Sequence, residues 1–205
     1  MGYKTIKHRG EASFIEKRSE FIGRVCPVTS EEEAVAFISE IRAANRKATH
    51  NCYAYILRDN NISRHSDDGE PGGTAGAPIL DALQKAGVTD IVCVVTRYFG
   101  GILLGAGGLV RAYSKSAALA LGSVDVISME LSDSIRAAFS YSYYGSVSAL
   151  ITAAGGMIRD TQYADGVEIF ADIKTEDTEG LFKKLTDACA GNIELEVLSS
   201  GYREF

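Results

Sequence analysis

Two glycine-rich segments, separated by one helix-sized and one strand-sized stretch, constrain the fold of this chain more than any other feature. They run from Arg64 to Gly76 (RHSDDGEPGGTAG) and from Thr96 to Gly108 (TRYFGGILLGAGG). Glycine is favoured where the backbone takes positive φ or approaches a neighbour closely. Binding residues concentrate on loops that a rigid scaffold holds in place. We therefore expect two loops on one α/β domain that face a common groove.

The sequence around these loops predicts regular helices and strands. A capping box of Ser30 and Glu33 precedes apolar residues at helical spacing and predicts a helix over 31–44. We expect Thr74 to cap the helix between the two loops and Gly87 to end it. The other expected elements are a β-hairpin of 3–7 with 12–17, strands over 21–28, 52–57 and 90–96, and a long helix over 109–121.

The remainder of the chain predicts a second domain. Its pattern indicates strands over 131–143, 157–163, 167–174 and 192–199, and helices over 144–154 and 178–190. This βαββαβ order is that of a ferredoxin-like fold, and we expect its tyrosines at 141, 143 and 144 to pack between strand and helix. The sequence thus predicts an α+β protein with an N-terminal α/β domain over 1–130 and a ferredoxin-like domain over 131–205.

Charge is distributed unevenly between the two predicted domains. Residues 1–130 hold 15 Lys plus Arg against 15 Asp plus Glu, whereas residues 131–205 hold 6 against 12. A neutral domain with local basic clusters can meet an anion such as RNA, but an acidic one repels it. No apolar run approaches the roughly 18 residues of a membrane span, and four dispersed cysteines indicate neither a disulfide framework nor a zinc site. We expect a cytoplasmic protein without a membrane partner.

The first loop carries three carboxylates, on Asp67, Asp68 and Glu70, beside His65. Three interpretations are open: a structural role in turns, helix capping and salt bridges; contact with a ligand or partner; or a metal held by carboxylate oxygens. EF-hand spacing is absent, and a second histidine ligand would have to be His50. Because no nucleophile motif accompanies the loop, we assign no catalytic residue, no metal site and no cofactor.

The second loop combines arginine, aromatic rings and a helix opened by glycines. Free amides at a helix start bind anions such as phosphate, arginine pairs with phosphate, and an aromatic ring can stack on a base. Nucleotide-binding glycine spacings are absent, and the alternative is that Phe99 simply fills the core. We predict one binding groove from His50, Arg64, His65, Asp67, Asp68, Glu70, Arg97, Tyr98, Gly100, Gly101, Gly107, Gly108, Arg111 and Lys115.

The segments DDGEPGGTAGAPIL (67–80) and VTRYFGGILLGAGGLVRAY (95–113) closely resemble the YigZ/IMPACT family, as do the length and domain order of the chain. The resemblance is to bacterial YigZ-type members, since the RWD domain of the eukaryotic members is not in this sequence. It implies an N-terminal domain folded like domain IV of elongation factor G and a ferredoxin-like domain resembling its domain V. It also implies a link to translational control, which the eukaryotic members exert by competing for a partner of a kinase that acts on an initiation factor.

Three functions follow as hypotheses. The first is a non-enzymatic binding module that contacts RNA or the ribosome through the glycine-rich loops. The second is a regulator of translational control that binds a protein partner. The third, ranked last, is a metal-assisted phosphate-processing enzyme that uses Asp67, Asp68 and Glu70.

Overall fold

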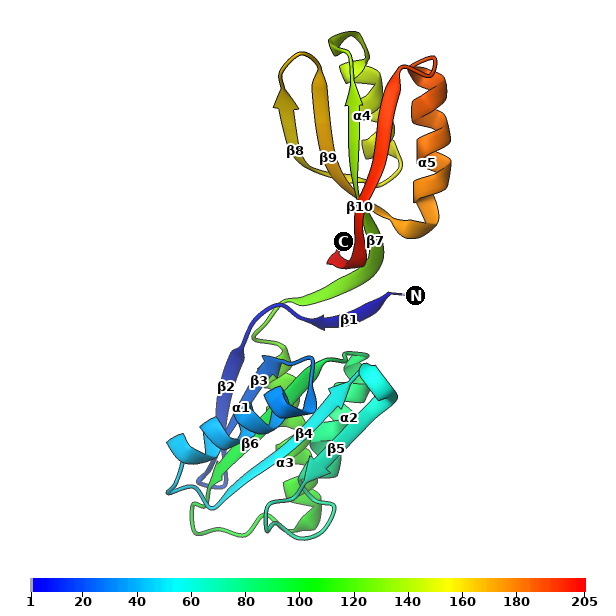
Figure 1. Ribbon diagram of the computed structural model, residues 1–205. Helices are drawn as coiled ribbons and strands as arrows, with labels where there is room; N and C mark the ends of the chain where they lie inside the picture. The colour runs from blue at the N-terminus through cyan, green and yellow to red at the C-terminus, as the bar shows by residue number, and fades with distance from the viewer. Residues whose placement is uncertain (1) are drawn as a thin grey trace. The chain divides into compact units, whose positions relative to one another are not determined.

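The computed structural model describes residues 2–205, which form two compact units. The N-terminal unit comprises Tyr3–Ser128, and the C-terminal unit comprises Met129–Phe205 with Gly2. Antiparallel sheet and helix occur in both, so the protein is of the α+β class (Figure 1). None of the helices in residues 2–205 is long and apolar enough to cross a membrane.

The N-terminal unit is a three-layer sandwich around one antiparallel sheet. Its sheet order is β2-β3-β6-β4-β5, formed by β2 (Gly10–Glu16), β3 (Ser19–Pro27), β6 (Ile91–Tyr98), β4 (His50–Leu57) and β5 (Ile62–Ser66). Helix α1 (Glu31–Ala44) covers one face, and α2 (Gly76–Ala86) and α3 (Ala106–Leu121) cover the other (Figure 1). The short strand β1 (Tyr3–Ile6) bridges from Lys4 to Val88, just before β6.

The central strand β6 shows why the sheet has helices on both faces. Its residues from Ile91 to Val95 are all fully buried, and odd and even positions point in opposite directions. Cys93 belongs to the core beneath α2 and α3, whereas Val92 and Val94 belong to the core beneath α1. A run of apolar, mostly β-branched residues therefore stabilises both layers at once.

The ends of the first two helices test the capping predictions. The Ser30 hydroxyl accepts from the Glu33 amide at 3.2 Å, as the capping box predicts, and α1 spans the expected residues. The backbone and hydroxyl of Thr29 donate to the Glu33 carboxylate, which holds its pKa below the ordinary value. Gly87 ends α2 in the left-handed conformation with φ of 68°, also as predicted.

The expected hairpin of residues 3–7 with 12–17 is wrong. Strand β2 pairs with β3 instead, in a register that joins Glu16 to Ser19 across a two-residue turn. Both turn residues, Lys17 and Arg18, have positive φ, of 46° and 65°. Such a turn normally takes Asn or Gly, so its sequence gives no sign of it. Strand β5 and the 3₁₀ turn before it (Asp59–Asn61) were not expected either.

The C-terminal unit has the predicted βαββαβ order. Its elements are β7 (Val126–Phe139), α4 (Tyr144–Ala153), β8 (Met157–Tyr163), β9 (Val167–Lys174), α5 (Thr175–Ala188) and β10 (Ile193–Glu204), with a 3₁₀ turn at Tyr141–Tyr143 before α4. Strands β10, β7, β9 and β8 lie side by side in that order, the arrangement of a split βαβ sandwich. Ile135, Ala137 and Phe139 of β7 pack with residues of α4 and α5 in a single core, and both helices lie on the same face of the sheet (Figure 1).

Candidate functional site

Asp67 of the first glycine-rich loop caps helix α2. One carboxylate oxygen accepts from the amides of Ala75 and Gly76 at 3.0 and 2.9 Å, and the other accepts from Gly73 at 2.8 Å. The prediction that Thr74 caps this helix is wrong, because the Thr74 hydroxyl donates to the Pro71 carbonyl instead. Burial alone would raise the pKa of Asp67, but the three amides outweigh it and hold that pKa below its ordinary value.

Asp68 ties the same loop to strand β4 and to α1. Its carboxylate accepts from the Asn51 amide and from the Arg42 guanidinium, both at 2.6 Å. Its backbone carbonyl lies 2.8 Å from Nδ1 of His50. Asp68 itself has a φ of 44°, a left-handed conformation that these contacts stabilise.

Glu70 and Arg97 form a buried ion pair that joins the two glycine-rich segments. Nη1 of Arg97 lies 2.6 Å from the Glu70 carboxylate, which also accepts from the Tyr113 hydroxyl at 2.7 Å. His50 Nε2 lies 3.9 Å from the same oxygen. Arg97 is only 5% exposed, and Nε of Arg97 has no hydrogen-bond partner within residues 2–205. The guanidinium is thus part of the core, although the sequence favoured it as an exposed anion contact.

These interactions occupy the whole acidic trio. Each of the three carboxylates accepts from a guanidinium, a hydroxyl or backbone amides inside the unit. In the part of the chain that the structure describes, no group of three or more His, Cys, Asp and Glu side chains is arranged to hold a metal. The geometry therefore supports the structural interpretation of this loop.

The remaining predicted residues do not all gather in one place. Arg64 and His65 are exposed on β5, at the opposite edge of the sheet from β2. The Tyr98 hydroxyl donates to Asn45 at 2.9 Å, at the end of α1. Gly100 abuts the chain at Arg18, since a Cβ built on it would meet the Arg18 carbonyl oxygen at 2.0 Å. Gly101 has a φ of 83° and turns the loop away.

A pocket beside the first turns of α3 contains three other residues of the predicted groove. It has a volume of about 250 Å³, and its wall includes Gly108, Arg111 and Lys115. The turn residue Lys17 adds a third cation, and Phe14 of β2 an aromatic ring. The ammonium of Lys115 lies 4.4 Å from the centre of that ring. Lys17 and Phe14 were missed because only the β2–β3 hairpin, which the sequence did not reveal, places them beside α3.

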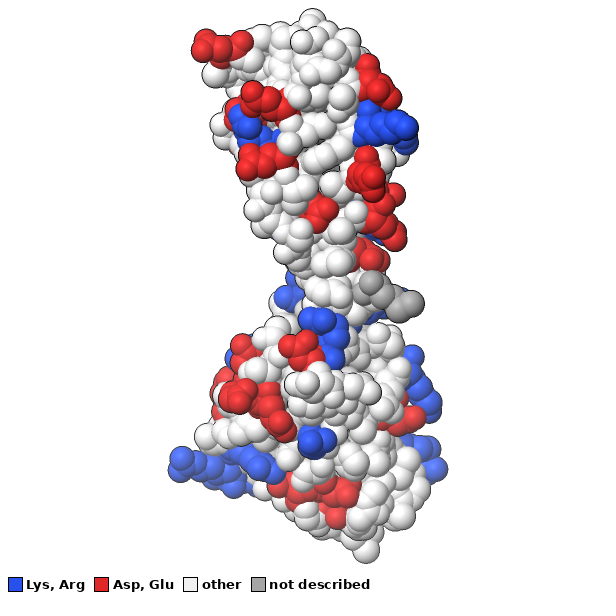
Figure 2. Space-filling model, turned by 45° about the vertical axis from the view of Figure 1, so that its right-hand side comes forward, with Lys and Arg blue, Asp and Glu red and all other residues white. Residues whose placement is uncertain are grey.

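The three cations of this pocket are available to a ligand. Lys17, Arg111 and Lys115 are exposed, and none of them makes an ion pair with another described residue. The single carboxylate in the wall is that of Glu16. Exposed basic side chains occur at several points of the N-terminal unit, whereas acidic ones prevail on the visible face of the C-terminal unit (Figure 2).

Fold and site together define a class: a two-unit α+β protein with a braced glycine-rich loop pair and a basic pocket beside it. Residues 17–121 match the Impact N-terminal domain, and residues 138–192 match a domain of unknown function, DUF1949. The chain belongs to the IMPACT family, which confirms the resemblance seen in its sequence.

Similar proteins cover most of the chain. It is 35% identical to IMPACT family member YvyE of Bacillus subtilis (strain 168), over 95% of this chain and 90% of that protein. It is 34% identical to IMPACT family member YigZ of Escherichia coli (strain K12), over 87% and 89%. Protein IMPACT of Xenopus laevis is 36% identical over 44% of this chain and 30% of its own length. A solved crystal structure of a hypothetical protein is 30% identical, with a TM-score of 0.62 over 97% of this chain and 98% of that one.

Proposed function

We propose that this chain is a non-enzymatic binding protein linked to translation, and that its N-terminal unit contacts RNA, either free or in the ribosome. The observation that carries the proposal is the basic pocket of Lys17, Arg111 and Lys115, three exposed cations without an ion-pair partner among the described residues. Phosphate contacts of this kind supply most of the affinity of nucleic-acid binding. Membership of the IMPACT family supports the link to translation.

The position of the pocket suits a phosphate. It lies beside the first turns of α3, whose first residue is Ala106: Leu104 and Gly108 form part of its wall, and Arg111 and Lys115 follow one and two turns further along. Amides in the first turn of a helix bind anions, and the helix dipole adds to the attraction there. Gly108 of that turn lines the pocket. Gly107 and Gly108 in the first turn carry no side chain that would keep a ligand away from the backbone.

Salt-dependent RNA binding tests the proposal. The double variant Arg111→Gln/Lys115→Gln should weaken binding of a labelled RNA, measured by fluorescence anisotropy. It should also reduce the slope of log affinity against log salt by about 0.7–0.9 for each phosphate that the variant no longer neutralises. The matched control is Lys183→Gln/Lys184→Gln on α5, which removes the same charge from exposed helix positions. Equal affinity and slope in both double variants would refute the proposal.

A second control shows whether the double variant still folds. Exposed substitutions away from caps and ion pairs change stability by about 0.5 kcal/mol or less. The thermal midpoint of Arg111→Gln/Lys115→Gln should therefore fall by no more than about 2–4 °C, through loss of the contact between Lys115 and the Phe14 ring. Arg97→Ala would be unsuitable as a binding variant, because it disrupts the buried pair with Glu70.

One observation favours the alternative of a protein partner in translational control. The loop after β6 exposes apolar side chains, with Leu103 81% exposed and Phe99 45% exposed. Exposed apolar patches often mark protein contacts. A Leu103→Asp variant should then lose a partner that remains bound to the parent chain after nuclease treatment. Loss of that partner on nuclease treatment alone would instead favour RNA.

A further inference from the structure

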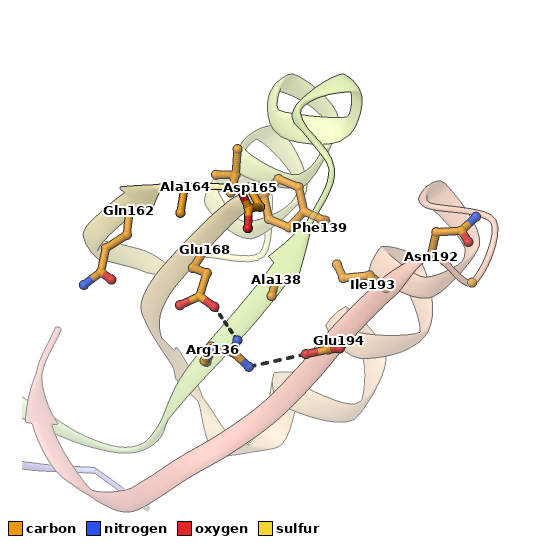
Figure 3. Close-up of a pocket in the computed structure, with 13 residues that line it drawn as sticks. Arg136, Ala138, Phe139, Gln162, Ala164, Asp165, Glu168, Asn192, Ile193 and Glu194 are labelled. Carbon is orange, nitrogen blue, oxygen red and sulfur yellow. Dashed lines mark hydrogen bonds and ion pairs between the residues drawn. The ribbon is translucent and has the colours of Figure 1, made fainter.

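The open face of the C-terminal sheet carries a hollow of about 720 Å³. Its floor is Ala138 of β7, which lies in register with Glu168 of β9 on one side and Glu194 of β10 on the other. The small side chain of Ala138 leaves space between the two glutamates, and all three belong to the face that α4 and α5 do not cover (Figure 3).

Negative charge at this hollow exceeds positive charge. Arg136 donates to Glu168 and lies 3.7 Å from Glu194, and these contacts appear as dashed lines in Figure 3. Glu196 faces Arg136 in the strand register, and Asp165 lies in the wall of the hollow. Three carboxylates therefore lie around one guanidinium, and that of Asp165 adds a further negative charge in the wall. The hydrogen bond from Arg136 also lowers the pKa of Glu168, so this carboxylate is ionised at neutral pH.

Three tyrosines lie near this end of the sheet but on its other face, because Tyr163 is in register with the buried Val167 whereas its neighbour Gln162 lines the hollow. Tyr141, Tyr144 and Tyr163 are 53%, 38% and 59% exposed, although the sequence predicted that the first two would pack between strand and helix. The rings of Tyr141 and Tyr163 are stacked at 6.3 Å, and that of Tyr144 lies 6.0 Å from Tyr163. The Tyr141 hydroxyl donates to the carbonyl of Ala164, a residue of the hollow.

We propose that this hollow on the open face of the sheet binds a basic, extended segment of a partner protein. Charge complementarity selects the occupant, because excess carboxylates attract arginine and lysine and repel phosphate. The hollow belongs to the C-terminal unit alone, so the inference does not depend on RNA contact by the N-terminal unit.

A labelled peptide of alternating arginine and glycine serves as the probe for the full chain. Binding should be detectable by fluorescence anisotropy, and a peptide with glutamate in place of arginine should not bind. The variant Glu168→Gln/Glu194→Gln keeps the shape of the hollow and should weaken binding by about five- to ten-fold, as expected for two exposed ion pairs. Tyr163→Leu removes an exposed ring from the opposite face of the sheet and should leave binding unchanged.

The matched control is Glu179→Gln/Asp187→Asn on α5, which removes the same charge from exposed positions of the covering helix. Equal weakening by this control would overturn the proposal, as would absence of binding or equal binding of the glutamate peptide. Self-association of the parent chain in sedimentation velocity, abolished in Glu168→Gln/Glu194→Gln, would identify a second copy as the occupant and also overturn it.

Discussion

The acidic trio of the first glycine-rich loop and the cations of the helix after the second loop use their charges in opposite ways. In the first loop every carboxylate is bound within the unit: Asp67 to amides of α2, Asp68 to Asn51 and Arg42, and Glu70 to Arg97 and Tyr113. The second loop leads into a helix whose cations Arg111 and Lys115 make no ion pair in residues 2–205. Among the described residues, the cations of α3 and not the acidic trio are therefore left without an ion-pair partner inside the unit.

The largest loss of stability should come from Arg97→Met, which breaks the buried ion pair with Glu70. Removing one member of a buried ion pair leaves the other charge uncompensated, which costs about 3–5 kcal/mol. Urea unfolding should show this decrease in stability. Adding Glu70→Gln should recover part of it, because no buried charge then remains without a partner. If Arg97→Met alone were as stable as the parent chain, the buried ion pair would not stabilise the two loops.

Replacing two glycines of the second glycine-rich segment with alanine should change stability in opposite directions. Gly100→Ala places a Cβ 2.0 Å from the Arg18 carbonyl oxygen and should cost about 1–3 kcal/mol through overpacking. In Gly107→Ala the new Cβ lies 3.6 Å from Nη1 of Arg111, an ordinary separation, and the change should stabilise α3 by about 0.5 kcal/mol. Thermal unfolding of the two variants checks the opposite signs. Equal destabilisation by both would mean that the helix start is as tightly packed as the loop.

A smaller, pH-dependent effect should come from the cap of α2. Asp67→Ala should cost about 1–2 kcal/mol at neutral pH, because the amides of α2 lose their acceptor. The folded-state pKa of Asp67 is lowered, so its stabilisation is present above the unfolded pKa of about 3.9 and is lost as pH falls through the folded value. The stability difference between parent and variant, followed by urea unfolding, should therefore shrink below about pH 4. A difference independent of pH would contradict a role for the ionised carboxylate.

The sequence predicted the α+β class, the βαββαβ order of the C-terminal unit and the caps at Ser30 and Gly87. These features depend on local residue patterns, which a single chain displays directly. The sequence did not predict the features that depend on contacts between residues far apart in the chain. The turn at Lys17 and Arg18 is made by pairing of β2 with β3, and Asp67 reaches α2 from outside the capping position that Thr74 was expected to fill.

The sequence predicted only part of the candidate site, again because contacts between distant residues complete it. Alternation along β6 indicates that Arg97 shares a face with Val95, but only the position of Glu70 explains how a charge remains there. Arg111 and Lys115, four residues apart on α3, were both in the predicted groove. Lys17 and Phe14 come from the first hairpin of the chain, far earlier in the sequence, and no periodicity connects them to that helix.

The four cysteines offer separate reporters of opening for the two units. All are free and buried, with Cys52 and Cys93 in the N-terminal core and Cys189 in the C-terminal core. Burial raises the pKa of Cys52 and of Cys93 to about 12, so their thiols should react with alkylating reagents only when the surrounding structure opens. Alkylation rates resolved by peptide mass spectrometry would then measure how often each unit opens, in a chain that carries no amino-acid substitution.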